Sequence, residues 1–272
     1  MSGLSTERVA AELDRLLDGM APGRGLRALA SCGGLEAVLP ELAPMRGCEQ
    51  NSFHRFDVWE HTVVTVDMIA VDEGSRRLRR WAALLHDVGK PGVRHRKANG
   101  EWGFFRHETA GAEVARRLML RLGVAKEDRL AVELVVRRHM DRPRPEDRRS
   151  VRRFMHRCRG HWEDLLALQR ADNSSHTYDD SAYADALSRA CREAAAKDAE
   201  ALKARSPLSG DDLMALFGRK PGPWIRRVKD RLGAMVLDGD LAPDDREAAA
   251  RAAAELVAEP AHADGDGRRQ AP

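Results

Sequence analysis

Apolar residues recur at helical spacing along almost the whole chain, and this periodicity is the feature that most limits the fold. In residues 6–18, for example, Val9, Leu13, Leu16 and Leu17 share one face of a helix. Aromatic residues make up only 5% of the chain, whereas Ala, Leu and Arg are abundant, and this composition also favours helices over sheets. The sequence therefore predicts an all-α fold.

Turn signals separate the expected helices. Pro and Gly mark turns around 22–25 and 40–47, and residues 92–106 are expected to form a loop with a turn at Asn99-Gly100. The expected helices span 6–18, 57–72, 76–88, 108–122, 126–140, 148–158, 161–172, 181–204, 209–218, 221–239 and 243–258.

This pattern predicts one continuous helical body with extensions at both ends. No stretch approaches ~20 consecutive apolar residues, so no membrane-spanning helix is expected. The N-terminus carries charges where a signal peptide needs an apolar core, and the four Cys form no CxxC pair, so a cytoplasmic protein is expected. The expected organisation is an N-terminal helical lead-in over 1–50, a core over 51–180, a C-terminal helical extension over 181–259 and a disordered tail over 260–272.

Positive charge is unevenly distributed. The formal net charge is only +3, but residues 137–159 hold ten Arg against three acidic residues, a local net charge of +7. One interpretation of this segment is a solvated helix face with a loop. The other is a surface for a polyanion such as RNA.

The main local signal for chemistry is the pair His86-Asp87 at the end of the apolar helix 76–88, which Gly89 follows as an expected C-cap. Two titratable side chains at the end of a buried helix need a partner, because burying them unpaired is costly. A cation suits both, since a helix C-terminus is the negative end of its dipole.

Four more polar residues lie in or at the ends of apolar helices. His61 lies within one helix, His107 opens another, and His139 and Asp172 each end one. Taken singly, each is explained by a capped helix end or by a hydrogen-bonded core histidine. As an ordered set with His86-Asp87, they indicate a metal centre, and imidazole with carboxylate ligands suits first-row transition metals without selecting one.

The order of these residues resembles that of the HD-domain metal-dependent phosphohydrolases. Within that family, residues 6–255 resemble the C-terminal half of bacterial CCA-adding tRNA nucleotidyltransferases, also called poly(A)-polymerase-like proteins. The motifs that carry the resemblance are ASCGGLEAVLPEL, EQNSFHRFDVWEHT, RWAALLHDVGKPGVR, WGFFRHETAGAEVARRLMLRLG, VVRRHM, SVRRFM, LLALQRAD and PLSGDDLMALFGRKPGPWIRRVKDRLGAMVLDG.

The resemblance implies an HD-domain helical bundle that binds one or two divalent metal ions, from Mn, Fe, Co, Ni or Zn, with Mg also allowed. Water activated by such ions would attack phosphorus, while the ions neutralise charge on the phosphoryl oxygens. By resemblance, His61, His86, Asp87 and Asp172 would hold the principal metal, and His107 and His139 would complete a second site.

The resemblance also implies residues that contact the substrate. Asp87 would act as a bridging or base-like residue, and Lys90 would contact phosphate, unless it is only a surface cation beside the helix end. His54 either faces the substrate or caps the helix that starts near Asp57. Further phosphate-binding candidates, each also explained as a solvated side chain, are Arg106, Arg138 and Arg142.

One departure limits what the resemblance implies. The related tRNA enzymes begin with a nucleotidyltransferase head that carries paired catalytic Asp residues, whereas residues 1–50 contain no Asp-x-Asp and no strand-like run. Nucleotide addition is therefore not expected of this segment.

Three functions remain open on the sequence alone. The first is a phosphohydrolase of small nucleotides, such as nucleoside monophosphates or 2′,3′-cyclic phosphates. The second is an RNA-binding or regulatory module without catalysis, which the basic segment favours and the intact ligand set disfavours. The third is a di-iron oxygenase, since some HD proteins use this ligand set for oxygen chemistry.

Overall fold

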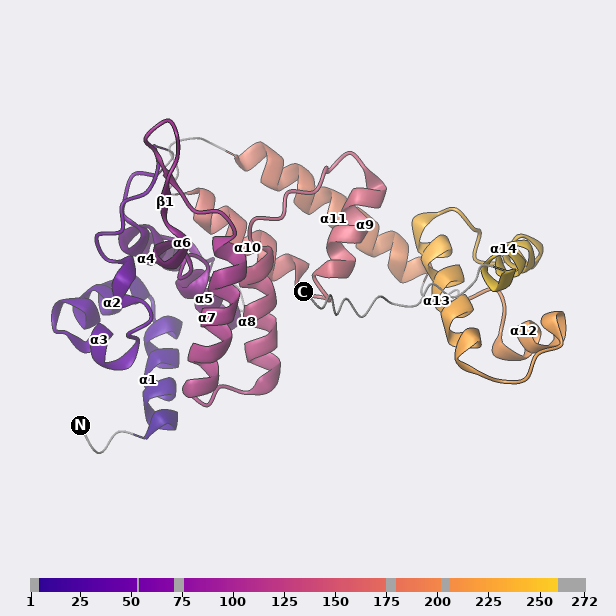
Figure 1. Ribbon diagram of the computed structural model, residues 1–272, viewed down its shortest axis with the longest axis horizontal. Coiled ribbons are helices and arrows are strands. Elements are labelled where there is room, and N and C mark those ends of the chain that lie inside the picture. Colours follow the sequence, from indigo (N-terminus) through magenta and orange to yellow (C-terminus); the bar gives the residue numbers. More distant parts are fainter. Residues whose placement is uncertain (1–4, 53, 71–75, 175–179, 202–205, 259–272) are drawn as a thin grey trace, which may run out of the picture. The chain divides into compact units, whose positions relative to one another are not determined.

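A computed structural model describes the protein over residues 5–52, 54–70, 76–174, 180–201 and 206–258. Helices form nearly all of the regular structure in these ranges, and one short hairpin is their only sheet (Figure 1). The all-α prediction is therefore confirmed. The tail predicted over 260–272 lies outside the described residues.

The chain divides into two compact units, Met1–Cys191 and Arg192–Pro272, and the boundary falls inside helix α11. The first unit contains, in chain order, α1 (Thr6–Asp18), α2 (Pro22–Ser31), α3 (Gly34–Val38), the 3₁₀ helix η1 (Ala43–Met45), α4 (Val58–Met68), α5 (Arg76–Leu85), α6 (Lys90–Val93), β1 (His95–Arg96), β2 (Trp102–Gly103), α7 (His107–Arg121), α8 (Lys126–Arg138), α9 (Arg148–Arg157), α10 (Trp162–Asn173) and the first part of α11 (Ser181–Ala201). The second unit contains the rest of α11, then α12 (Gly210–Phe217), α13 (Pro223–Asp238) and α14 (Arg246–Ala258).

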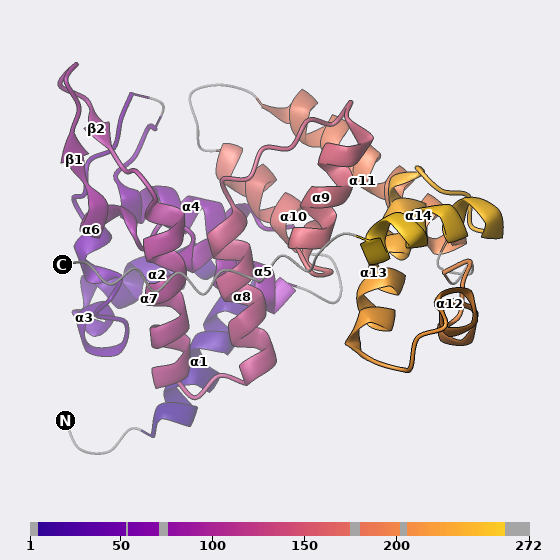
Figure 2. The ribbon, with the colours of Figure 1, turned by 45° about the vertical axis from the view of Figure 1, so that its right-hand side comes forward.

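Three local predictions differ from the structure in a way that has a physical reason. The turn expected around 22–25 is the first turn of α2, because Pro22 occupies the opening of the helix, where its missing N–H costs nothing. The loop expected over 92–106 contains the end of α6 and the antiparallel hairpin β1–β2, which projects from the helices (Figure 2). Gly89 has φ −80°, so it is not the left-handed C-cap that the sequence predicts.

Gly89 is instead needed for a close approach between two backbones. A Cβ atom at this position would lie 2.3 Å from the carbonyl oxygen of His107 and 2.5 Å from the amide nitrogen of Gly111. Any larger residue would therefore push α7 away from the end of α5. This contact places His107 beside the residues that follow α5.

The core of the first unit lies among α4, α5, α7, α8 and α10, which pack against one another. Each buried aliphatic side chain there contributes roughly 1.5–3 kcal/mol to stability. The fully buried side chains include Val63 on α4, Leu84 and Leu85 on α5, Leu118 on α7, Val136 on α8 and Leu168 on α10.

The second unit has a small apolar core of its own. Helix α12 begins with a capping box, in which Ser209 and Asp212 exchange hydrogen bonds between side chain and backbone. Leu213, Val228 and Leu232 are buried in this core against Ala side chains of α14. Among the described helices of both units, none combines the length and the apolar character that a membrane span requires.

Candidate metal centre

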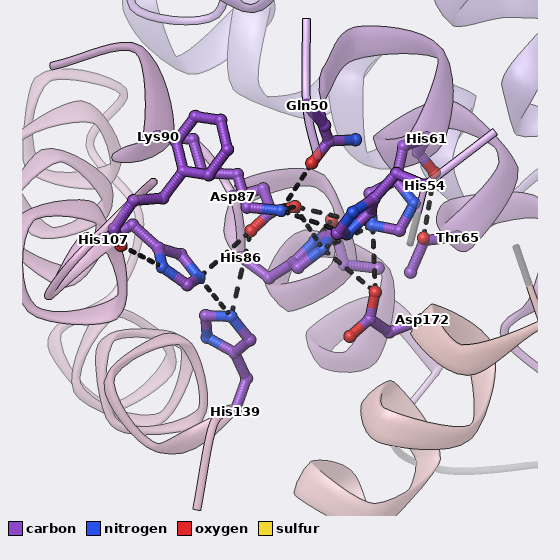
Figure 3. A network of polar contacts seen from close by, with 12 residues as sticks. Gln50, His54, His61, Thr65, His86, Asp87, Lys90, His107, His139 and Asp172 are labelled. Carbon is purple, nitrogen blue, oxygen red and sulfur yellow. Dashed lines mark hydrogen bonds and ion pairs between the residues drawn. The ribbon is translucent and has the colours of Figure 1, made fainter. Parts of the chain in front are cut away.

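The six residues predicted as metal ligands come from separate elements of the first unit and converge on one buried centre (Figure 3). Each is supplied by a helix or by the residues at its end, so the centre depends on how these helices pack. His61 lies on α4, His86 and Asp87 directly follow α5, His107 opens α7, His139 ends α8 and Asp172 lies in the last turn of α10.

Asp87 lies at the middle of the centre and faces both sides of it. Its Oδ2 atom lies 3.2 Å from His86 Nε2 and 3.5 Å from His61 Nε2. Its Oδ1 atom lies 3.4 Å from His107 Nε2 and 3.9 Å from His139 Nε2. Two groups of potential ligands, each with two imidazoles, therefore share the one carboxylate.

Three of the imidazoles are oriented by backbone carbonyls. The Nδ1 atoms of His86, His107 and His139 lie 2.7, 2.9 and 2.7 Å from the carbonyl oxygen three residues earlier in the chain. Because a carbonyl only accepts, each Nδ1 must carry the proton. In the neutral imidazole, Nε2 then presents a lone pair to the centre, which is the usual arrangement for a metal-binding histidine.

The Nε2 atoms of the imidazoles face one another in two pairs at short range. His107 Nε2 lies 3.1 Å from His139 Nε2, and His61 Nε2 lies 3.3 Å from His86 Nε2. Burial lowers the pKa of His107, and burial together with the neighbouring imidazoles lowers the pKa of His139 to about 3, so neither is charged at neutral pH. The facing Nε2 lone pairs of His107 and His139 repel unless a cation lies between them, and this donor pair therefore fits a divalent metal.

The second carboxylate stabilises the other side of the centre. Asp172 Oδ1 lies 2.9 Å from His61 Nε2 and 3.6 Å from His86 Nε2. Burial opposes a charge on His86, but the Asp87 and Asp172 carboxylates outweigh burial and raise the pKa of His86 to about 10. Burial also opposes charge on both carboxylates, yet the imidazoles hold their pKa values well below the usual range.

Lys90 is buried in this network and is not a surface cation. Its Nζ atom lies 2.7 Å from Asp87 Oδ2 and donates a hydrogen bond of 2.6 Å to Gln50 Oε1. Gln50 is itself oriented, because its Nε2 atom donates to the carbonyl oxygen of Phe56. Sequence reasoning missed Gln50, since no spacing rule marks a lone amide in a loop; its only signal is its place in the motif shared with His54.

The structure distinguishes the two interpretations of His54. The cap of α4 is Asp57, whose Oδ1 accepts from the backbone N–H of Glu60 at 2.8 Å. His54 instead points toward the centre, with its Nε2 atom 3.5 Å from Lys90 Nζ and its ring 5.1 Å from that of His61. Its Nδ1 atom is held by Asn51 at 2.8 Å.

The three predicted arginines lie close in sequence to the centre but differ in their environments. Arg106 is exposed and directly precedes His107. Arg138 precedes His139 and lies 3.6 Å from Asp141. Arg142 lies 3.4 Å from both an amide oxygen of Asn173 and a carboxylate oxygen of Asp180. Among the described residues, Arg138 and Arg142 thus each contact a carboxylate, whereas Arg106 forms no ion pair.

Comparison with known protein families supports the metal-binding site that the geometry indicates. The model of the HD domain matches residues 55–196, which are about half of the chain and include all six ligand candidates of the centre. The chain belongs to the HD-domain family. A second model, described as the probable RNA- and SrmB-binding site of polymerase A, matches residues 1–46. HD domains bind divalent metals, and the two His/Asp groups of this chain are suited to hold them.

Similar proteins include several tRNA-modifying enzymes. An A-adding tRNA nucleotidyltransferase from Deinococcus radiodurans is 36% identical over 82% of this chain and 52% of its own length. A CC-adding tRNA nucleotidyltransferase from Thermus thermophilus is 39% identical over 82% of this chain and 50% of its own length. A bifunctional uridylyltransferase/uridylyl-removing enzyme from Ruegeria pomeroyi is 32% identical over 47% of this chain and 15% of its own length. The HD-domain chain thus spans about half the length of the two tRNA enzymes it matches.

Proposed function

We propose that this HD-domain protein is a metal-dependent phosphohydrolase that acts on nucleotides, such as nucleoside monophosphates or 2′,3′-cyclic phosphates. The observation that carries the proposal is the convergence of four imidazoles and two carboxylates on one buried centre with facing Nε2 atoms. Such a donor set would suit one or two divalent ions.

The proposed chemistry divides between the metal and the protein. His61, His86, Asp87 and Asp172 would hold one ion, and His107 and His139, with Asp87, would hold a second. When bound, such ions would lower the pKa of bound water and so supply a hydroxide nucleophile near neutral pH. Asp87, whose carboxylate stays ionised, would accept a hydrogen bond from the attacking water and orient it.

Lys90 supplies the charge that a phosphate requires. Its ammonium group is buried beside Asp87 and is fixed by Gln50, so it is already ordered before a substrate arrives. A fixed cation in a site that excludes water stabilises the charge that develops on phosphoryl oxygens. His54, beside Lys90, and Arg106, at the start of α7, are proposed as further substrate contacts.

RNA is the second proposed partner. The N-terminal match to an RNA-binding family and the names of the tRNA-acting relatives favour it. The basic segment predicted for RNA includes α9, on which Arg148, Arg149 and Arg153 are exposed. An RNA-binding module without catalysis would have no need to keep all six ligands.

The test is a phosphate-release screen on the purified full chain, with metal content measured on the same sample. The substrates are nucleoside 5′-, 3′- and 2′-monophosphates and 2′,3′-cyclic nucleotides, with added Mn, Ni, Co or Mg. We expect metal-dependent release that His86→Ala abolishes and that the control His156→Ala, an exposed histidine on α9, leaves unchanged. No metal binding and no release, together with binding of RNA, would replace the enzyme proposal with the RNA-binding one.

A further inference from the structure

The segment that enters α7 exposes an aromatic ring beside the metal centre. Phe105 is 77% exposed, which makes it the most exposed aromatic side chain in the part of the chain that the structure describes. Its neighbour Phe104 is half-buried, and the following ligand candidate His107 is buried. An isolated exposed apolar residue needs no explanation in general, but this one lies two residues before His107, a ligand candidate of the metal centre.

The backbone at this point is held in an unfavourable conformation. Arg106 has φ +60°, in the left-handed region that residues other than glycine rarely adopt. It directly precedes α7, and no side chain caps this helix. The conformation accompanies a sharp change in burial, since Phe105 and Arg106 are exposed while His107 is buried. Strain of this kind clusters at functional sites, where it fixes the direction of side chains.

Phe105 must lie close to the centre. Two peptide units separate it from His107, so their Cα atoms are at most about 7.6 Å apart. The carbonyl oxygen of Phe104 accepts from His107 Nδ1, and Lys90 Nζ lies 5.5 Å from the centroid of the Phe104 ring. Phe104, which directly precedes Phe105, therefore contacts both a metal-ligand candidate and the lysine proposed to bind phosphate.

The chemistry of the segment suits a flat group joined to an anion. The guanidinium of Arg106 lies 5.8 Å from the centroid of the Phe105 ring, so an aromatic face and a cation are presented together. A nucleobase stacks on such a ring, and every base offers a face for this contact. Residues 94–106, which lead into α7, are also cationic. They contain one acidic residue, Glu101, against Arg94, Arg96, Lys97 and Arg106.

We infer that Phe105 stacks on the nucleobase of the substrate while Arg106 pairs with its anionic groups. Phe105 then determines specificity for nucleotides over phosphate esters that lack a base. The inference rests on the proposed function, because it places the phosphate at the metal centre. A protein partner fits less well, since a lone ring among cations is not the contiguous apolar patch of a protein interface.

The test measures binding rather than turnover. The full chain in EDTA is titrated with adenosine 5′-monophosphate and with ribose 5-phosphate, which differ only in the base. We expect the wild type to bind the nucleotide about 5- to 150-fold more tightly, the range that stacking on one aromatic residue produces. Phe105→Ala should remove this preference, and Phe105→Tyr should retain it.

Two further variants separate the roles of the two residues. Arg106→Gly keeps the left-handed backbone and removes the guanidinium, so it should weaken binding of both ligands while the preference for the base remains. The matched control is Leu130→Ala, which removes a 53% exposed side chain on α8 and should change neither affinity.

The outcomes distinguish the inference from the proposed function. A wild type that does not discriminate, or a Phe105→Ala variant that still does, overturns the inference even if phosphate release is observed. Equal weakening of both ligands by Phe105→Ala also overturns it, because that result marks a structural role. A base preference that depends on Phe105, without any metal-dependent phosphate release, supports the inference and overturns the proposed hydrolysis.

Discussion

Replacement of Asp87 by Asn should destabilise the metal-free protein, because it leaves the Lys90 ammonium group buried without its carboxylate partner. The Asp87 side chain is 2% exposed and the Lys90 side chain 6%, with 2.7 Å between Asp87 Oδ2 and Lys90 Nζ. Removing one partner of a buried ion pair costs about 3–5 kcal/mol, because the remaining charge stays desolvated without compensation. Gln50 would still accept from Lys90, so the lower end of this range is expected.

The expected change is large enough to measure in EDTA. In a unit of this size each kcal/mol corresponds to a shift of about 2–4 °C in the unfolding temperature, so Asp87→Asn should lower it by about 6–12 °C. Urea unfolding followed by tryptophan fluorescence reports mainly on the first unit, which holds four of the five Trp. With added metal, the variant should also lack the stabilisation that ligand binding gives the wild type.

A double variant tests the physical cause. Asp87→Asn combined with Lys90→Met leaves no unpaired buried charge, so it should be more stable in EDTA than Asp87→Asn alone. If the single and double variants unfold at the same urea concentration, the stranded cation is not the cause. If Asp87→Asn retains the full metal-induced stabilisation, Asp87 does not hold the metal.

Two further predictions concern protons and the anchoring of Lys90. Because its pKa is raised to about 10, His86 is protonated at neutral pH in the metal-free protein. Metal binding at pH 7.5 should therefore release a proton. The affinity for metal should rise as the pH increases toward 10. Calorimetry in buffers of different ionisation enthalpy measures this release, and its absence would contradict the protonation of His86. Gln50→Leu removes a hydrogen bond to a charged group, worth about 1.5–3 kcal/mol, and should lower kcat/KM for phosphate release at least 10-fold. Ser52→Ala, an exposed change in the same loop, is the control.

The helices of this protein could be predicted from sequence because their determinants are local. Apolar spacing and caps such as Ser5 and Asp57 lie within a few residues of the helices they define, and α1 was predicted with the bounds that the structure has. Helix α2 is not among the predicted helices, because Pro22 followed by Gly23 is equally typical of a turn. Only packing against the rest of the unit decides between the two.

The candidate centre was predictable for a different reason. Taken singly, each imidazole or carboxylate at the end of an apolar helix has an ordinary structural explanation, and it is their order in the chain that carries the resemblance. Gln50 and Phe105 could not be found in this way, since an amide in a loop and an aromatic residue before a helix are common. Their significance comes from distances to Lys90 and from exposure, which are properties of the folded chain.

The charges of the centre explain why Lys90 is buried. Two ionised carboxylates in a site shielded from water need positive charge close by. In the metal-free protein that charge comes from Lys90 and from protonated His86. Lys90 Nζ lies 2.7 Å and His86 Nε2 lies 3.2 Å from Asp87 Oδ2. A divalent ion held by His61, His86 and Asp87 would supply the positive charge that both groups now provide. Metal binding would therefore displace the His86 proton and free the Lys90 ammonium group to pair with the phosphate of a substrate.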